Sequence, residues 1–156
     1  MRSLYGSPVD DEYSTCRSTY ATLRLYPGNL SPEEVTQALD LEPDSIQIKG
    51  RTVNGRKVKL NGWFLCSERH VQSRDSRRHI SWLLDLLEPR KAAFQLLEER
   101  GCGGDIACMW DSKYGHGGPT LDPDIMRRLA DLNLEIWFDV YAKDINIIDG
   151  AIVDNL

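Results

Sequence analysis

The sequence predicts an α+β fold, a mixed and mostly antiparallel sheet with helices packed on one of its faces. Some segments alternate apolar and polar residues with the period of a strand, and others repeat apolar residues with the period of a helix. The order along the chain is strand, helix, two or three strands, long helix, strand, helix, strand. Because this order suggests split β-α-β connections, we expect a ferredoxin-like topology.

The first two elements are a strand and a short helix. Residues 20–26 alternate apolar with polar or aromatic side chains, which predicts a strand with one buried face. Residues 31–39 begin with Ser31 as N-cap, a proline in the first helical position and Glu34 as the capping-box acid. These signals predict a helix that starts at residue 31 or 32.

The next segment predicts two or three short strands. Residues 46–49 and 58–60 flank the dipeptide Asn54-Gly55, whose tolerance of left-handed backbone suits a hairpin turn. After a second turn, residues 63–67 have the composition of another strand. The polar residues 68–75 predict a loop.

The second half of the domain is predicted to hold a bent helix pair and a strand. Apolar residues recur with helical spacing from Ser76, and Pro89 bends the helix or opens a second one that ends near Gly101. Residues 105–111 predict a strand with apolar side chains on both faces, and the glycine-rich residues 112–119 predict a loop.

The last part of the domain repeats the pattern of capped helix and strand. Asp122 and the proline after it predict a helix start, and the apolar periodicity ends near Asn133. Residues 134–141 predict the last strand. We expect three regions: a flexible N-terminal tail over residues 1–18, one α+β domain over residues 19–142, and a C-terminal tail or added edge strand over residues 143–156.

Composition narrows the class of protein. The chain has 156 residues, 41% of them hydrophobic, and no apolar run near the roughly 20 residues of a membrane span. Its four cysteines form no Cys-x-x-Cys pair and no signal peptide is visible, which argues against a disulfide framework and a zinc knuckle. We therefore expect a cytoplasmic protein without membrane association, metal or cofactor.

Charge is unevenly distributed. The net charge is −5, but residues 49–78 hold nine basic and two acidic residues, a local net charge of +7 that leaves −12 for the rest. Such a block suggests a surface that attracts an anionic partner, and the alternative is an ordinary solvated hairpin and helix start. The residues expected to contact phosphate groups are Arg51, Arg56, Lys57, Lys59, Arg74, Arg77 and Arg78.

One loop carries residue types that could do chemistry. Asp111, Ser112 and His116 lie at a strand end and on the glycine-rich loop, where they could form a general acid and base group. Because adjacent strand residues point to opposite faces, Asp111 and Ser112 would not meet. The alternative is that these residues satisfy backbone groups of a turn.

Two further residues are expected on the outer face of the sheet. Arg24 and Trp137 come from strands whose opposite sides are apolar. Aromatic and charged side chains on an open sheet would suit a stacked base or a protein partner. If the long helix packs on that face instead, the same aromatic residues belong to the core.

Short motifs along residues 20–141 together resemble a known family. They are Tyr20-Ala21-Thr22-Leu23, Ser31-Pro32-Glu33-Glu34, Leu39-Asp40-Leu41-Glu42-Pro43, residues 63–67, Trp82-Leu83-Leu84-Asp85, Glu88-Pro89, Trp110-Asp111-Ser112, Gly117-Gly118-Pro119 and Arg128-Leu129-Ala130. The chain resembles the bacterial proteins grouped as domain of unknown function 4279. The resemblance implies a compact bacterial α+β domain and supplies no catalytic residues.

Three functions follow from these observations. The first is a non-enzymatic module that binds a protein, in the manner of an immunity or adaptor protein, or that assembles as a homo-oligomer. The second is nucleic-acid or phosphate binding through residues 49–78, against which the net charge of −5 counts. The third is a small enzyme with a site at residues 111–118.

Overall fold

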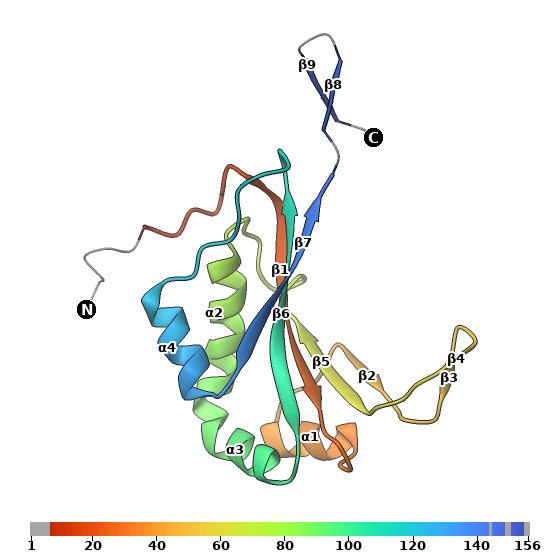
Figure 1. The fold of residues 1–156 in the computed structure, drawn as a ribbon. Helices are drawn as coiled ribbons and strands as arrows, with labels where there is room; N and C mark the ends of the chain where they lie inside the picture. The colour runs from red at the N-terminus through yellow and green to blue at the C-terminus, as the bar shows by residue number, and fades with distance from the viewer. Residues whose placement is uncertain (1–6, 144, 149–150, 155–156) are drawn as a thin grey trace.

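The computed structural model describes residues 7–143, 145–148 and 151–154. Its elements are β1 (Cys16–Tyr26), α1 (Pro32–Leu39), β2 (Ser45–Gln47), β3 (Thr52–Val53), β4 (Arg56–Lys57), β5 (Gly62–Cys66), α2 (Ser76–Leu87), the 3-10 turn η1 (Glu88–Arg90), α3 (Lys91–Glu99), β6 (Gly103–Ser112), α4 (Pro123–Asp131), β7 (Glu135–Ala142), β8 (Ile145–Ile148) and β9 (Ala151–Asp154). The helices lie on one side of a five-stranded sheet (Figure 1). The predicted α+β class, with a mixed and mostly antiparallel sheet, is confirmed.

The strand order of the main sheet is β2-β5-β1-β6-β7. All neighbours are antiparallel except β6 and β7, which are parallel. It follows that β5 separates β1 from β2, and that β1 separates β5 from β6, so two β-α-β connections are split. The ferredoxin-like prediction depends on such connections and stays a prediction, while α4 and β7 add a direct, unsplit β-α-β connection at one edge.

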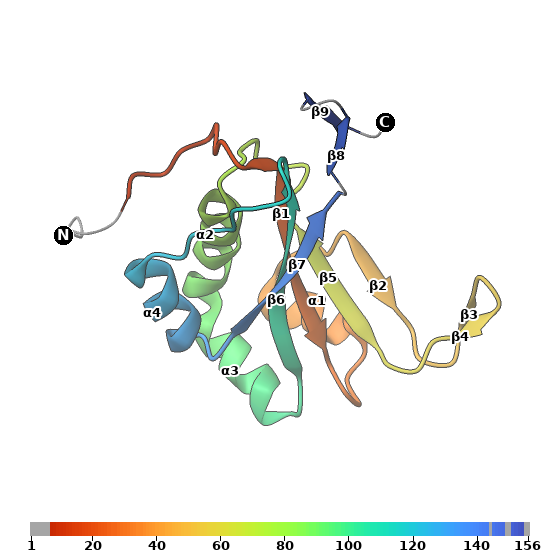
Figure 2. The ribbon, with the colours of Figure 1, turned by 45° about the horizontal axis from the view of Figure 1, so that its top comes forward.

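The two faces of the sheet differ sharply. Ala21, Leu23 and Leu25 of β1 have no exposed surface and face the helices, while their neighbours Tyr20 and Arg24 are only partly covered. Figure 2 shows α2, α3 and α4 on the same side of β6. No described helix lies over the opposite face, so the alternative in which the long helix covers it is wrong.

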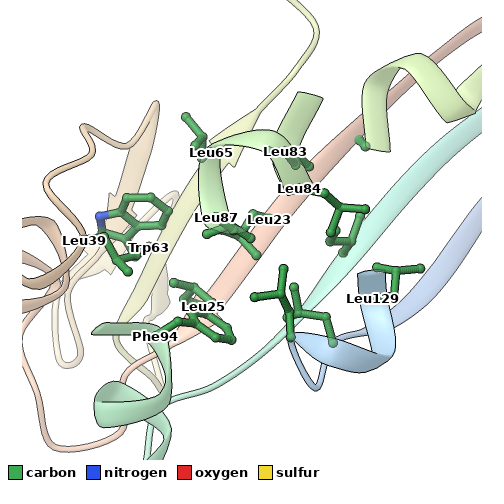
Figure 3. Packing of buried hydrophobic residues seen from close by; sticks show 14 of the residues in the cluster. Leu23, Leu25, Leu39, Trp63, Leu65, Leu83, Leu84, Leu87, Phe94 and Leu129 are labelled. Carbon is green, nitrogen blue, oxygen red and sulfur yellow. The ribbon is translucent and has the colours of Figure 1, made fainter. Parts of the chain in front are cut away.

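The core lies between the sheet and the helices. It includes Leu23 and Leu25 of β1, Leu84 and Leu87 of α2, and Trp63 of β5 (Figure 3). The Trp63 indole is fully buried, and its Nε1 donates a hydrogen bond of 3.0 Å to the hydroxyl of a threonine on α1. The helices therefore cover most of the inner face of the sheet, and the other face has no helix over it in the described residues.

Local signals placed the helices correctly. The N-cap Ser31 accepts a hydrogen bond of 3.2 Å from the backbone N of Glu34, whose carboxylate accepts one of 2.8 Å from the backbone N of Ser31. Asp75 and Asp122 are the N-caps of α2 and α4, and each accepts one hydrogen bond from a backbone N of the first turn, without a reciprocal bond. The predicted bend at Pro89 is the 3-10 turn between α2 and α3.

The predicted hairpin is only partly correct. The turn at Asn54-Gly55 is present, but it joins the short strands β3 and β4 instead of residues 46–49 and 58–60. Ile46 lies in β2 and pairs with Trp63 of β5 in the main sheet. Residues 50–59 consequently form a separate small hairpin that extends from the body (Figure 1).

The first and last strands can be compared with the predicted boundaries of the domain. β1 begins at Cys16, so the predicted boundary after residue 18 falls inside the central strand. β8 and β9 pair with each other in a two-stranded sheet instead of adding an edge strand to the main sheet. Residues 1–6 of the predicted tail lie outside the described residues.

Candidate functional site

The residues of the predicted basic block lie in two separate places. Arg51, Arg56 and Lys57 lie on the hairpin formed by β3 and β4, whereas Arg74 and Arg78 lie at the start of α2. The two places are on opposite sides of the molecule in both views (Figures 1 and 2). The block of residues 49–78 therefore does not form one surface.

Arg77 is buried, with 2% of its surface exposed. Its guanidinium lies 2.6 Å from Asp75 and donates hydrogen bonds to the backbone oxygens of Ser7 and Pro8 at 2.8 and 2.9 Å. Burial raises the pKa of Asp75, but the hydrogen bonds that it accepts outweigh burial and hold the pKa below its usual value. Arg77 is thus part of the folded structure and is not placed to contact a phosphate group.

The other two arginines of this end are paired with an acidic N-terminal segment, which we define as residues 7–13. Arg74 donates to the Glu12 carboxylate, and Arg78 Nε lies 3.1 Å from Asp11 Oδ1. A hydrogen bond from the Ser73 hydroxyl and the contact with Arg78 lower the pKa of Asp11. Positive charge at the start of α2 is therefore largely neutralised within the chain. The run of acidic residues in this segment was the only sequence signal for the contact.

The hairpin retains the positive charge of the block. We call residues 49–59 the basic hairpin, because it holds five basic residues and no acidic one. All five side chains are exposed, and no ion pair joins any of them to an acidic residue in the described part of the chain. These residues are Lys49, Arg51, Arg56, Lys57 and Lys59.

The glycine-rich loop has a structural arrangement. Ser112 is buried and its hydroxyl donates a hydrogen bond of 2.8 Å to the backbone oxygen of His116. Asp111 points to the other face, where one oxygen lies 3.9 Å from Arg17. The His116 ring is exposed and stacks on Tyr114 with 6.0 Å between ring centroids. Asp111, Ser112 and His116 therefore do not form a nucleophile and base pair.

The histidines of the middle segment are used in packing. His79 is buried between the Ser67 hydroxyl, 2.7 Å from Nδ1, and the backbone oxygen of Ser73, 2.9 Å from Nε2. Burial lowers the pKa of His79, which keeps the ring neutral at physiological pH. Among the described residues, no three His, Cys, Asp or Glu side chains gather closely enough to hold a metal ion.

One side of the main sheet has no described helix over it. We call it the outer face, and its side chains come from four neighbouring strands. They are Tyr20, Thr22, Arg24, Tyr26, Phe64, Cys66, Asp105, Ala107, Met109, Asp111, Glu135, Trp137, Asp139 and Tyr141.

Arg24 is held rigidly near the middle of the outer face. Its Nε and Nη2 atoms donate hydrogen bonds of 2.7 and 2.5 Å to the two carboxylate oxygens of Asp105. Its guanidinium carbon lies 5.2 Å from the ring centroid of Trp137, a cation-π distance. The hydrogen bonds with Asp105 raise the pKa of Arg24, so the side chain stays charged.

The aromatic side chains of β7 are the most accessible part of the outer face. Trp137 is 49% exposed and lies opposite Ala107 of β6, whose methyl group leaves much of the indole uncovered. Tyr141 is 53% exposed and donates a hydrogen bond of 2.9 Å to Asp139. Alternation along the strands correctly placed Arg24 and Trp137 on this face.

Comparison with protein families gives a match. Residues 15–143 match the family described as "Domain of unknown function (DUF4279)". No curated protein and no solved structure matches the chain. Within the described residues, no helix has the length and apolar composition needed to cross a bilayer.

Proposed function

The chain belongs to the DUF4279 family, whose description states no activity, and we propose from its surface that it is a non-enzymatic module that binds another protein through its outer face. The observation that carries this proposal is the half-exposed Trp137 beside the immobilised Arg24 on an uncovered sheet. Tryptophan and arginine are enriched among the residues that dominate binding energy at protein interfaces.

The geometry reduces the entropic cost of binding. Arg24 is held by two hydrogen bonds from one side and by the Trp137 ring from the other. Side chains already fixed in the free protein lose little rotamer freedom in a complex. The outer face is therefore preorganised for contact.

Charge indicates the kind of partner. Arg24 forms its ion pair with Asp105, while Asp139 and Glu135 on β7 form no ion pair among the described residues. A partner with basic side chains around an apolar centre would complement this arrangement and associate faster at low salt. An immunity or adaptor role, in which this module covers a basic surface of another protein, fits that chemistry.

The test is affinity capture from the native host, with and without nuclease, at low and high salt. We expect a stoichiometric protein partner that resists nuclease and whose recovery falls at least about tenfold with Trp137→Ala. Leu96→Ala is the matched control, because Leu96 is 60% exposed on α3, away from the outer face. Equal recovery by the Trp137→Ala variant, or recovery of nucleic acid alone, would overturn the proposal.

The basic hairpin favours a second candidate, binding to a nucleic acid. Its five exposed basic side chains are unpaired with any described acidic residue and extend from the body. Arg56→Glu with Lys57→Glu should abolish binding to a labelled duplex, whereas Arg127→Glu on α4 should not. A binding constant that does not change with salt would argue against phosphate contacts.

The compartment and source are part of the proposal. Four described cysteines, Cys16, Cys66, Cys102 and Cys108, are free thiols, which supports a reducing compartment. We infer a cytoplasmic bacterial protein. Recovery of the native protein in the periplasmic fraction would contradict this inference.

A further inference from the structure

β7 is the last strand of the main sheet, and its backbone edge that faces away from β6 pairs with no described residue. It spans eight residues and is paired with β6 along one side. In Figure 1 it lies in front of the other strands, with no helix drawn across it. Its exposed side chains include Trp137, Val140 and Tyr141, at 49%, 55% and 53%.

Soluble proteins ordinarily protect such an edge. They use short strands, proline, lysine or a bulge to prevent another strand from pairing with it. β7 has no lysine and no proline, and its register with β6 is continuous. β7 carries two acidic residues, Glu135 and Asp139, but none of the other devices, and an exposed edge of eight residues indicates that a strand of another chain pairs with it.

We propose that β7 pairs with β7 of a second copy, antiparallel about a two-fold axis at Phe138, so that two main sheets join into one. The strand is complementary to itself in this arrangement. On the inner side, Ile136 lies opposite Val140 of the second copy, and the two Phe138 side chains meet. On the outer side, Trp137 lies opposite Asp139, and Glu135 opposite Tyr141, so each acid faces a neutral side chain.

Other positions of the axis are less favourable. A two-fold axis perpendicular to the sheet keeps inner residues opposite inner residues, so it must pass through a residue and not between two. An axis at Trp137 places Glu135 opposite Asp139, and an axis at Asp139 places two aspartates opposite each other, which is destabilising. An axis at Val140 leaves only residues 138–142 paired.

The dimer would also enlarge the proposed binding surface. Both outer faces would lie on the same side of the joined sheet, with both copies of Trp137 near the axis. The dimer itself does not rest on the proposed function, because the complementary edge of β7 is present whether or not a partner binds the outer face.

Sedimentation equilibrium of the full chain tests the proposal. We expect a dimer at about 1 to 100 μM protein, and a dissociation constant at least about tenfold higher for Val140→Lys. Val53→Lys is a matched control, because Val53 is 56% exposed on the basic hairpin. A monomer at all these concentrations, or a dimer that Val140→Lys and Val53→Lys weaken equally, would overturn the proposal.

Disulfide trapping tests the register without relying on a destabilised variant. In the proposed register, a cysteine from Trp137→Cys in one copy lies opposite a cysteine from Asp139→Cys in the second copy, and both are on the outer face. Residues opposite each other in an antiparallel pair are close enough for a disulfide. In a Cys66→Ser background we expect a covalent dimer from this pair under mild oxidation. The pair Trp137→Cys with Tyr141→Cys should link only if the axis lies at Asp139, so preferential linking of that pair would overturn the register. A trapped dimer without any captured partner would leave the dimer supported and the proposed function refuted.

Discussion

The buried ion pair between Asp75 and Arg77 offers the sharpest stability test. Neither side chain has more than 3% of its surface exposed, and the two are 2.6 Å apart. Asp75→Asn removes the negative charge but keeps an oxygen that can still cap α2 by accepting from the backbone N of residue 77. The perturbation therefore isolates the charge of one buried group.

The expected loss of unfolding free energy follows from the Arg77 charge that stays buried after the substitution. Removing one partner of a buried pair leaves the Arg77 guanidinium charged and uncompensated, which costs about 3 to 5 kcal/mol. Asp11→Asn is the matched control, because Asp11 and Arg78 are each 53% exposed. An exposed pair contributes about 0 to 1 kcal/mol, so the two identical substitutions should differ several-fold.

Urea unfolding at pH 7 measures both values through the transition midpoint. Adding Arg77→Met to Asp75→Asn should recover part of the lost free energy of unfolding, since no buried charge then remains unpaired. A loss for Asp75→Asn no larger than that for Asp11→Asn would refute the reasoning. So would a double variant less stable than Asp75→Asn alone.

The remaining predictions concern packing and titration. Gly104→Ala should destabilise the fold by about 1 to 3 kcal/mol, because the added Cβ would lie 2.7 Å from a backbone oxygen of β1. Gly103→Ala should be neutral, because its added Cβ meets nothing within 4 Å, and urea unfolding midpoints compare the two variants. Leu84→Ala should cost about 2 to 5 kcal/mol by leaving a cavity, and Leu96→Ala under about 0.5 kcal/mol in the same assay. Burial lowers the pKa of His79 in the folded protein, so as the pH falls the unfolded chain binds a proton at this residue before the folded chain does. The free energy of unfolding should therefore fall as the pH drops through and below the unfolded pKa of about 6.5. A pH series of unfolding free energies with His79→Gln should lose that slope, and an unchanged slope would exclude His79 as its cause.

Local signals in the sequence were sufficient for the helices. The capping box at Ser31 and Glu34 involves residues three apart, so a short stretch of sequence is enough to recognise it. Strand pairing is not local. Nothing near Ile46 indicates that it pairs with Trp63 in the main sheet and not with its neighbour across the Asn54-Gly55 turn.

The candidate site was predictable only in part. The alternation of residues along the strands placed Arg24 and Trp137 on the same face of the sheet. Because both faces of the strands carry large side chains, the sequence alone did not decide which face the helices cover. The basic block was misleading for a different reason. Asp10 N binds the Asp75 carboxylate across 65 positions of sequence, and no local pattern reports a contact of that kind.

The central position of β1 also determines how this domain must fold. Thr19 is synthesised before Met109, yet its hydroxyl donates a hydrogen bond to the backbone oxygen of Met109, 90 residues later. The first strand has both of its sheet neighbours only after most of the domain has been synthesised, and closing so long a loop has an entropic cost before any contact compensates. We expect slow refolding, in milliseconds to seconds, as is typical of proteins dominated by distant pairings. During synthesis on the ribosome, the backbone edges of β1 would stay unpaired until β5 and then β6 have emerged.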